Sequence, residues 1–165
     1  MDFTIEEMQP SDWPQVSAIY LAGIKTGIAT FQGDVPSWDE WDHNHITTCR
    51  LVARSADMIL GWAALTPTSG RCVYAGVAEV SVYIGEASKR QGVGYALLME
   101  LIRRSEDNGL WTLQAGITKE NMPSRALHKK CGFREVGIRE RIARMPGGQW
   151  HDVVLLERRS KTVGI

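Results

Sequence analysis

The sequence predicts an α+β protein in which one sheet carries helices on its faces. The first observation is the alternation of side-chain directions over residues 78–84, which is the period of a strand with two different faces. The second is the leucine and isoleucine on one side of residues 97–102, which is typical of an amphipathic helix. The third is the order of these patterns, which gives seven strands and four helices without a regular βαβ repeat.

In the first half of the chain, polar residues mark where helices begin. Ser11 or Asp12 can cap a helix, because a short polar side chain accepts a hydrogen bond from an open backbone N–H group. Ser37 and Glu40 have the spacing of a capping box. We expect these elements in order: a strand over 2–7, a helix ending near 24–27, a loop or extended segment over 26–31, a helix from 36, and strands over 50–54 and 58–65.

In the second half, glycine and proline separate the elements. Asn108 and Gly109 stop the long helix, and Asn121 opens a short helix that has Pro123 in its first turn and ends at Gly132. We expect these elements in order: the strand over 78–84, the helix after 94, a strand over 110–117, the short helix from 121, a strand over 133–144, a turn at 146–148 and a strand over 149–158.

Length and charge limit the class of protein. The chain has 165 residues, of which 44% are hydrophobic, so we expect one domain spanning residues 1–165. Nineteen Lys and Arg residues balance nineteen Asp and Glu residues, so no preference for nucleic acid or a membrane surface follows. Because no apolar run resembles a signal peptide or is long enough to cross a bilayer, we expect a cytoplasmic location.

The cysteines and histidines do not indicate a metal site. The three cysteines are odd in number and far apart, and no Cys-x-x-Cys occurs, so we expect buried, reduced thiols. His43 and His45 have the spacing of a ligand pair, but the nearby sequence offers no third ligand. We therefore predict no bound metal.

A basic glycine loop lies between the strand over 78–84 and the long helix. Lys89 and Arg90 precede Gly92 and Gly94, and such a loop at a helix N-terminus can bind a phosphate through its backbone N–H groups. A tight turn with two solvated cations is the other interpretation. A dinucleotide-binding loop fits poorly, because Leu97 stands where the third small residue belongs.

At these residues the chain resembles the GNAT acetyltransferase superfamily, whose pyrophosphate loop reads Arg/Gln-x-x-Gly-x-Gly/Ala. Lys89 takes the place of the usual Arg or Gln, which keeps a hydrogen-bond donor but loses the guanidinium fork. The order of elements matches that fold along nearly the whole chain. Four further stretches resemble the phosphinothricin acetyltransferase-like branch: residues 26–31, 74–84, 121–133 and 148–153.

The resemblance implies the GNAT fold, with a mixed, mostly antiparallel sheet of seven strands and about four helices on its faces. Two central strands, those over 78–84 and 110–117, splay apart in that fold and hold acetyl-CoA as co-substrate. The cofactor-binding residues that it implies are Val82, Tyr83, Ile84, Lys89, Arg90, Gln91, Gly92, Val93, Gly94, Tyr95, Asn121 and Ser124.

Acetylation of an amine needs a proton acceptor, because only the neutral amine attacks the thioester. Glu79 is an acid within a strand rich in valine and tyrosine, and a surface charge on an edge strand is the other interpretation. The resemblance implies that Glu79 is the general base. A backbone N–H group of residues 82–84 can stabilise the charge that develops on the thioester oxygen.

His128 and Asn121 each have a structural and a functional interpretation. A single histidine on a helix is often a packed residue. The resemblance implies a catalytic role for His128, at a position where related enzymes carry a tyrosine that protonates the leaving thiolate, and a histidine can supply that proton. Asn121 is a helix cap, a contact to the pantetheine arm, or both.

The acceptor pocket is inferred from Phe31, Arg71 and Tyr74. The other interpretation is that the aromatic residues belong to the core and that Arg71 is a solvated turn residue. In the branch that the chain resembles, a basic residue at this position meets the anionic groups of the substrate.

The resemblance thus predicts transfer of the acetyl group to the α-amine of a small amino-acid-like acceptor, of the phosphinothricin or methionine sulfoximine type. The alternatives are another amine (a polyamine, an aminoglycoside or a protein N-terminus) and a non-catalytic acetyl-CoA-binding module. The expected partner is a small-molecule amine, with no nucleic acid and no membrane, and a homodimer is expected because the fold often forms one.

Overall fold

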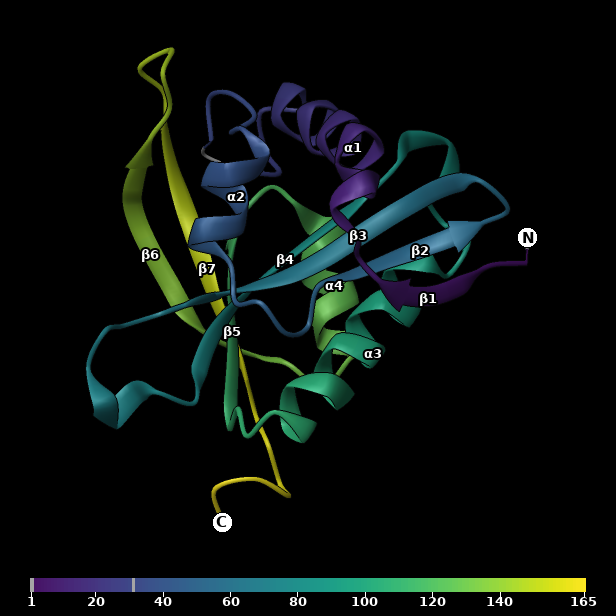
Figure 1. The fold of residues 1–165 in the computed structure, drawn as a ribbon. Helices are drawn as coiled ribbons and strands as arrows, with labels where there is room; N and C mark the ends of the chain where they lie inside the picture. The colour runs from purple at the N-terminus through teal and green to yellow at the C-terminus, as the bar shows by residue number, and fades with distance from the viewer. Residues whose placement is uncertain (1, 31) are drawn as a thin grey trace.

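The computed structural model describes residues 2–30 and 32–165, and within them seven strands form one sheet in the order β1-β2-β3-β4-β5-β7-β6 (Figure 1). All neighbouring pairs are antiparallel except β4 with β5. The predicted mixed, mostly antiparallel sheet is confirmed. The strands are β1 (Thr4–Glu7), β2 (Leu51–Ser55), β3 (Met58–Pro67), β4 (Val77–Ile84), β5 (Thr112–Thr118), β6 (Arg134–Arg144) and β7 (Trp150–Arg159).

Helices cover both faces of the sheet, and each face has its own hydrophobic core. The longer helices are α1 (Trp13–Lys25), α2 (Trp38–Asn44), α3 (Val93–Asp107) and α4 (Met122–Lys130), and the short 3-10 turns are η1 (Pro10–Asp12), η2 (Cys72–Tyr74) and η3 (Glu86–Ser88). The core under α3 includes Leu97, Leu98 and Leu101, and Leu127 of α4 packs against it. The core under α1 and α2 includes Val16, Trp41 and Trp62.

The alternation in β4 distributes its side chains between these two cores, as the sequence predicts. Val80, Val82 and Ile84 pack against the core under α3. Tyr83 faces the opposite side, where its ring stacks on Trp62 with 4.9 Å between the ring centroids. Because both faces of β4 are packed, its position in the sheet is fixed from two sides.

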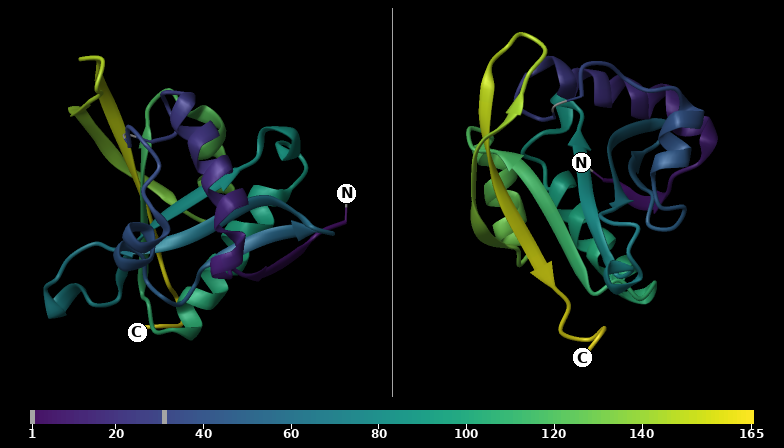
Figure 2. Two further views of the ribbon diagram at one scale, coloured as in Figure 1. Left: turned by 45° about the horizontal axis from the view of Figure 1, so that its top comes forward. Right: turned by 90° about the vertical axis from the view of Figure 1, so that its left-hand side faces the viewer.

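The parallel contact between β4 and β5 is short. Three residue pairs join the strands, of which Glu79 with Gln114 is the last. The strands then diverge, as the right-hand view of Figure 2 shows, because β5 continues in a full antiparallel pairing with β7. The splayed central strands that the resemblance implies are therefore present.

Gly76 closes the end at which β4 and β5 meet. Its carbonyl oxygen accepts hydrogen bonds from the N–H groups of Trp111 at 2.8 Å and Thr112 at 3.1 Å. The Trp111 ring covers this residue so closely that a Cβ atom added at Gly76 would lie 2.0 Å from it. A residue without a side chain is thus required at this junction.

Some sequence expectations need correction. Asp12 stands at the N-cap position of α1 but does not cap it. Its carboxylate accepts hydrogen bonds from Gln9 N and Arg54 Nη2, both at 2.8 Å, because a buried charge is stabilised by a cation. Cys72 is exposed on η2, whereas Cys49 and Cys131 are buried as expected, and all three thiols are free. β3 extends to Pro67, two residues beyond its predicted end at residue 65.

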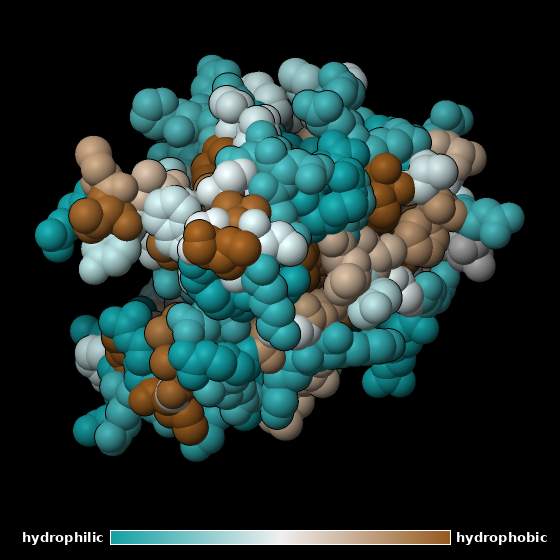
Figure 3. Space-filling model, turned by 90° about the horizontal axis from the view of Figure 1, so that it is seen from below, coloured by the Kyte–Doolittle hydropathy of each residue, from teal (hydrophilic) through white to brown (hydrophobic). Residues whose placement is uncertain are grey.

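Most exposed large apolar side chains are dispersed over the surface, and three of them lie on β6. Figure 3 shows one face, on which small hydrophobic groups stand among hydrophilic ones. The most exposed of the large ones outside the termini are Val73 at 66% and Met58 at 64%. In the described part of the chain, no helix combines the length and apolar character that crossing a membrane requires.

The requirement for glycine at position 76 can be tested by adding a methyl group there. We expect Gly76→Ala to lower the free energy of unfolding by about 1–3 kcal/mol, because the Trp111 ring must move to admit the methyl group. Gly70→Ala is the matched control, since nothing lies within 4 Å of the added Cβ atom there. Urea unfolding of both variants measures the difference, and equal stabilities would contradict the role given to the junction.

Candidate active site

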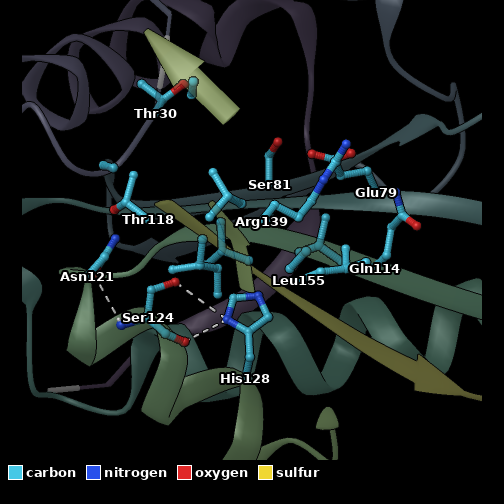
Figure 4. A pocket seen from close by; sticks show the side chains of 18 of the residues that line it. Thr30, Glu79, Ser81, Gln114, Thr118, Asn121, Ser124, His128, Arg139 and Leu155 are labelled. Carbon is cyan, nitrogen blue, oxygen red and sulfur yellow. Dashed lines mark hydrogen bonds between the residues drawn. The ribbon is translucent and has the colours of Figure 1, made fainter. Parts of the chain in front are cut away.

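A cavity of about 370 Å³ opens where β4 and β5 diverge. Figure 4 shows side chains from several elements pointing into it. The segment after α1 supplies Ala29 and Thr30, and α4 supplies Asn121, Ser124 and His128. The strands supply the other lining residues: Glu79–Tyr83 of β4, Gln114–Thr118 of β5, Arg139, Ile142 and Ala143 of β6, and Val153 and Leu155 of β7.

Glu79 lies at the point of divergence. It is the last residue of β4 paired with β5, and it is half-buried at the edge of the cavity. No hydrogen bond or ion pair within residues 2–30 and 32–165 engages its carboxylate. Beyond Glu79, the edge of β4 that faces β5 has no strand partner, so its backbone groups can pair with an extended ligand.

His128 is 4% exposed and contributes an imidazole to the cavity from α4 (Figure 4). Its Nδ1–H group donates to the carbonyl oxygen of Ser124 at 2.8 Å. Burial lowers the pKa of His128, and the hydrogen bond to Ser124 opposes this shift. The ring is thereby held in the tautomer whose Nε2 atom is an acceptor, and that buried atom has no protein partner among the described residues.

Asn121 and Ser124 hold the start of α4 beside the cavity. The Asn121 side chain accepts a hydrogen bond from Ser124 N at 3.3 Å, so Asn121 is the helix cap that the sequence predicts. Both residues also line the cavity, where their remaining polar atoms can meet a ligand. Whether either one contacts the cofactor stays a prediction.

The segment after α1 spans the gap between the two diverging strands. Thr118 Oγ1, on β5, donates to the carbonyl oxygen of Ile28 at 2.5 Å. The Thr30 side chain lies close to the hydroxyl groups of Tyr83 on β4 and Tyr20 on α1, where it lowers pKa values that burial raises. Residues 29 and 30 therefore form one wall of the cavity, and their segment is bonded to β5 and lies close to β4.

The loop before α3 has the geometry of an anion site but lies outside the cavity. Gly92 has a φ of 81° and Arg90 one of 61°. Ala96 N is bonded to Gly92 O at 3.0 Å, and the three preceding N–H groups of the helix start have no partner within the helix. Lys89 pairs with Glu86 on the surface.

Gly94 serves packing as well as this loop. A Cβ atom there would lie 3.1 Å from Leu127 of α4, so the glycine permits close contact between α3 and α4. Tyr95, one residue further, lies under Lys130 of α4, whose Nζ is 4.8 Å from the ring centroid. The long helix, the loop and α4 are thus held in one block beside β4.

Of the predicted acceptor residues, the two that the structure describes lie outside the cavity of this single chain. Phe31 lies outside the described residues. Arg71 and Tyr74 are exposed around η2, where the Arg71 guanidinium stands 5.7 Å from the Tyr74 ring centroid, and neither lines the cavity. Ile84 also lies outside the lining and packs in the core instead.

Sequence reasoning missed Arg139 and Gln114. Gln114 faces the cavity because it pairs with Glu79, and Arg139 reaches it from β6. The strand over 133–144 was predicted, but it carries several arginines, and no local signal distinguishes the one at position 139. Their place in the cavity depends on the order of strands in the sheet.

The histidine pair does not form a metal site. His45 stacks on Trp41 with 3.9 Å between the ring centroids, while His43 is exposed. Nowhere in the described residues do three or more His, Cys, Asp or Glu side chains gather as ligands.

Comparison with curated proteins finds phosphinothricin acetyltransferases and methionine sulfoximine acetyltransferases among the relatives. The chain is 32% identical to phosphinothricin N-acetyltransferase of Alcaligenes faecalis over 94% of its own length and 81% of that protein. It is 25% identical to L-methionine sulfoximine/L-methionine sulfone acetyltransferase of Pseudomonas aeruginosa, over 95% and 94% of the two chains.

The solved structures show the same fold. A GNAT superfamily phosphinothricin acetyltransferase from Sinorhizobium meliloti, in complex with acetyl-CoA, superposes with a TM-score of 0.89. It is 26% identical, and the match covers 99% of this chain and 91% of that one. The sequence pattern of the Acetyltransferase (GNAT) family matches residues 13–133. The chain therefore belongs to the GNAT family of acetyltransferases, whose acetyl donor is acetyl-CoA.

Proposed function

We propose that this enzyme transfers the acetyl group of acetyl-CoA to the α-amine of a small amino-acid-like acceptor, of the phosphinothricin or methionine sulfoximine type, with Glu79 as general base. One observation carries the proposal. Glu79 is the single carboxylate among the described cavity residues, it has no protein partner there, and it stands where the two central strands diverge. The names of the relatives support the acceptor class.

The chemistry needs a proton acceptor beside the attacking amine. The ammonium form of an amino acid predominates near neutral pH, and an ionised carboxylate can take its proton directly or through one water. Attack then places charge on the thioester oxygen. When this charge returns to the carbonyl, the C–S bond breaks, and the leaving thiolate takes the remaining proton that the attacking nitrogen loses. The open edge of β4 after Glu79 offers backbone N–H groups that can stabilise that oxygen, without any further side chain.

The same geometry supports a position for acetyl-CoA. The pantetheine arm would run along the open edge of β4, at Val82, Tyr83 and Ile84, and pass Asn121 and Ser124. Its pyrophosphate would lie at the loop from Lys89 to Gly94 and the first turn of α3, where N–H groups and Arg90 are available and Lys89 would exchange Glu86 for a phosphate. The thioester would then reach the cavity beside Glu79.

For His128, the structure supports one of two roles. It favours a contact to the bound acetyl donor, and it disfavours a general acid that is protonated before the reaction. A general acid must carry the proton that it gives, whereas burial favours the neutral form of this imidazole. With Nδ1–H bonded to Ser124, the Nε2 atom can only accept. We propose that Nε2 accepts a hydrogen bond from the pantetheine arm or from the thiol released in the reaction.

Three further expectations stand as parts of this proposal. We propose that residues 1–165 act as one domain, which the single sheet supports. We also propose a cytoplasmic homodimer. The edge strand β6 leaves Val136, Ile138 and Ile142 exposed, and such side chains support the association of two copies. Light scattering of the purified protein tests the dimer directly.

The alternative functions can be distinguished by measuring the release of thiol from acetyl-CoA. A non-catalytic acetyl-CoA-binding module would release no thiol from acetyl-CoA with any amine. An enzyme for polyamines, aminoglycosides or protein N-termini would release thiol with those amines and not with amino acids. A thiol-release screen over all these classes, including phosphinothricin and methionine sulfoximine, tests the proposed acceptor.

The base is tested by Glu79→Gln, which keeps the shape of the side chain and removes the proton acceptor. We expect kcat to fall by roughly 10²–10⁴-fold at pH 7, with part of the loss recovered at higher pH where more amine is neutral. Acetyl-CoA affinity, measured by calorimetry, should not change. Glu7→Gln is the matched control, because Glu7 is exposed on β1 away from the cavity. Full activity of Glu79→Gln at pH 7 would exclude Glu79 as the base.

The pyrophosphate position is tested by replacing both Lys89 and Arg90 with alanine. We expect KM for acetyl-CoA to rise by about tenfold or more, because charge-assisted hydrogen bonds to the phosphates are lost. S-acetylpantetheine lacks the pyrophosphate, so its kcat/KM should be unaffected. Lys161→Ala serves as the control, because Lys161 is exposed and follows β7. An equal loss with both acetyl donors would place the pyrophosphate elsewhere.

The neutral state of His128 is tested through stability. Its native pKa is lowered, so the unfolded state binds more protons as pH falls below the ordinary value of 6.5. The wild-type free energy of unfolding should therefore decrease on going from pH 7 to 5.5. Replacing His128 with asparagine or phenylalanine should reduce this slope, which is at most about 1.4 kcal/mol per pH unit for one proton. Part of the slope should remain, because burial also lowers the pKa of His45.

Urea unfolding at several pH values measures the slope for each protein. A variant that is less stable at every pH but keeps the wild-type slope would show that His128 is not the group that titrates.

A further inference from the structure

We propose that Arg139 binds the anionic group that an α-amino-acid acceptor carries beside its amine, and so makes the enzyme selective for such acceptors over simple amines. This inference rests on the proposed function, because it assigns the second charge of the acceptor to the cavity in which Glu79 is the base. Arg139 lies on β6, which two α-helices and one strand separate from β4 in the sequence.

Two charged side chains of opposite sign line the described part of the cavity. Among its described lining residues, Glu79 is the one carboxylate and Arg139 the one guanidinium, and neither Lys nor Asp is present. In Figure 4 the Arg139 side chain extends from β6 toward the side of the cavity on which Glu79 lies. A ligand between them meets an acid and a cation.

Arg139 has no carboxylate partner among the described residues, unlike most of the arginines near it. On β6 and α4, Arg134 pairs with Glu157, and Arg125 pairs with Glu135 at 3.0 Å. For the Arg139 side chain, no ion pair, hydrogen bond or ring contact occurs within the described residues. An arginine that lines a cavity without a partner has its donors available to a ligand.

The backbone of β6 is irregular at this residue. Arg139 pairs with Val153 of β7, and the register then shifts before Ala143 pairs with His151. In the shifted segment, Arg141 has a φ of 42° and its N–H group donates to Asp152 Oδ1 at 2.8 Å. A bulge of this kind redirects the side chains around it, and bulges are common beside active sites. Arg139 and, past the shift, Ala143 both line the cavity.

The pair of charges matches one acceptor class better than the others. An α-amino acid carries a cationic amine next to a carboxylate, which is the complement of a carboxylate next to a guanidinium. The planar guanidinium binds a carboxylate through two parallel N–H bonds, and this fixes the direction of the neighbouring amine. A polyamine offers no anion and brings a second cation toward Arg139, while a peptide N-terminus has an amide in place of the carboxylate.

Arg71 is the rival for this role, since it is the residue that the sequence predicts. It lies on the exposed η2 segment outside the cavity and faces the Tyr74 ring. The two arginines can be compared in the same assay.

The experiment compares acids with their carboxamides. Wild type and the variants Arg139→Gln and Arg139→Lys are assayed by thiol release with phosphinothricin and L-methionine sulfone, and with the same two compounds bearing a carboxamide for the α-carboxylate. We expect Arg139→Gln to raise KM for the acids by roughly 10- to 100-fold, because charge-assisted hydrogen bonds are lost. KM for the carboxamides should change less than about threefold. Arg139→Lys should restore part of the affinity for the acids, since it keeps the charge and loses the fork.

Two controls separate a binding role from a structural one. Arg134→Gln removes an arginine of the same strand that does not line the cavity, and it should leave both acceptor classes unchanged. Acetyl-CoA affinity, measured by calorimetry, should be the same in wild type and in the Arg139 variants.

Three results would overturn the inference. Equal KM changes for acids and carboxamides would give Arg139 a general structural role, and unchanged values would give it none. A selective effect in Arg71→Gln with none in Arg139→Gln would assign the anion to Arg71. The proposed function is judged from wild type alone: if wild type acetylates no amino acid but acetylates another amine, both the function and this inference fail.

Discussion

The short parallel contact between β4 and β5 is the constraint on which the rest of the structure depends. Three residue pairs join the strands at one end, where the Gly76 carbonyl holds two N–H groups and the Trp111 ring leaves no room for a side chain. Because β5 is fully paired with β7, it cannot follow β4 beyond that point. The cavity, the open edge of β4 and the position of Glu79 all result from this divergence.

Packing on both faces keeps the strands apart. The core under α3 holds one set of β4 side chains, and the aromatic cluster around Trp62 and Tyr83 holds the other. The segment after α1 then bridges the gap, through Thr118 on β5 and through Thr30 with Tyr83 on β4. A wall that is bonded to β5 and lies close to β4 keeps the cavity open at a fixed width, which an enzyme needs in order to orient two substrates.

Charge is distributed differently inside and outside the cavity. On the surface most arginines have a carboxylate or carbonyl partner, such as Arg103 with Glu100 and Arg158 with Glu106. In the cavity, Glu79 and Arg139 have none within the described residues, and burial keeps His128 neutral with an open acceptor atom. Most polar groups of a folded protein have hydrogen-bond partners, so the few that lack one are candidates for binding a ligand.

The sequence by itself determined the elements, the family and part of the site. Periodicity of two and of 3.6 placed β4 and α3, and a cap at Asn121 placed α4, because each of these signals acts between residues close in the chain. The glycine loop was found because it is one continuous stretch, and Glu79 was found through the resemblance that the loop and the neighbouring stretches carry. Only the tertiary structure decided that Arg139 and Gln114 join Glu79, and that Asp12 binds Arg54 instead of capping α1. Those contacts depend on strand order and on the burial of charge, which bring distant residues together and which no local pattern encodes.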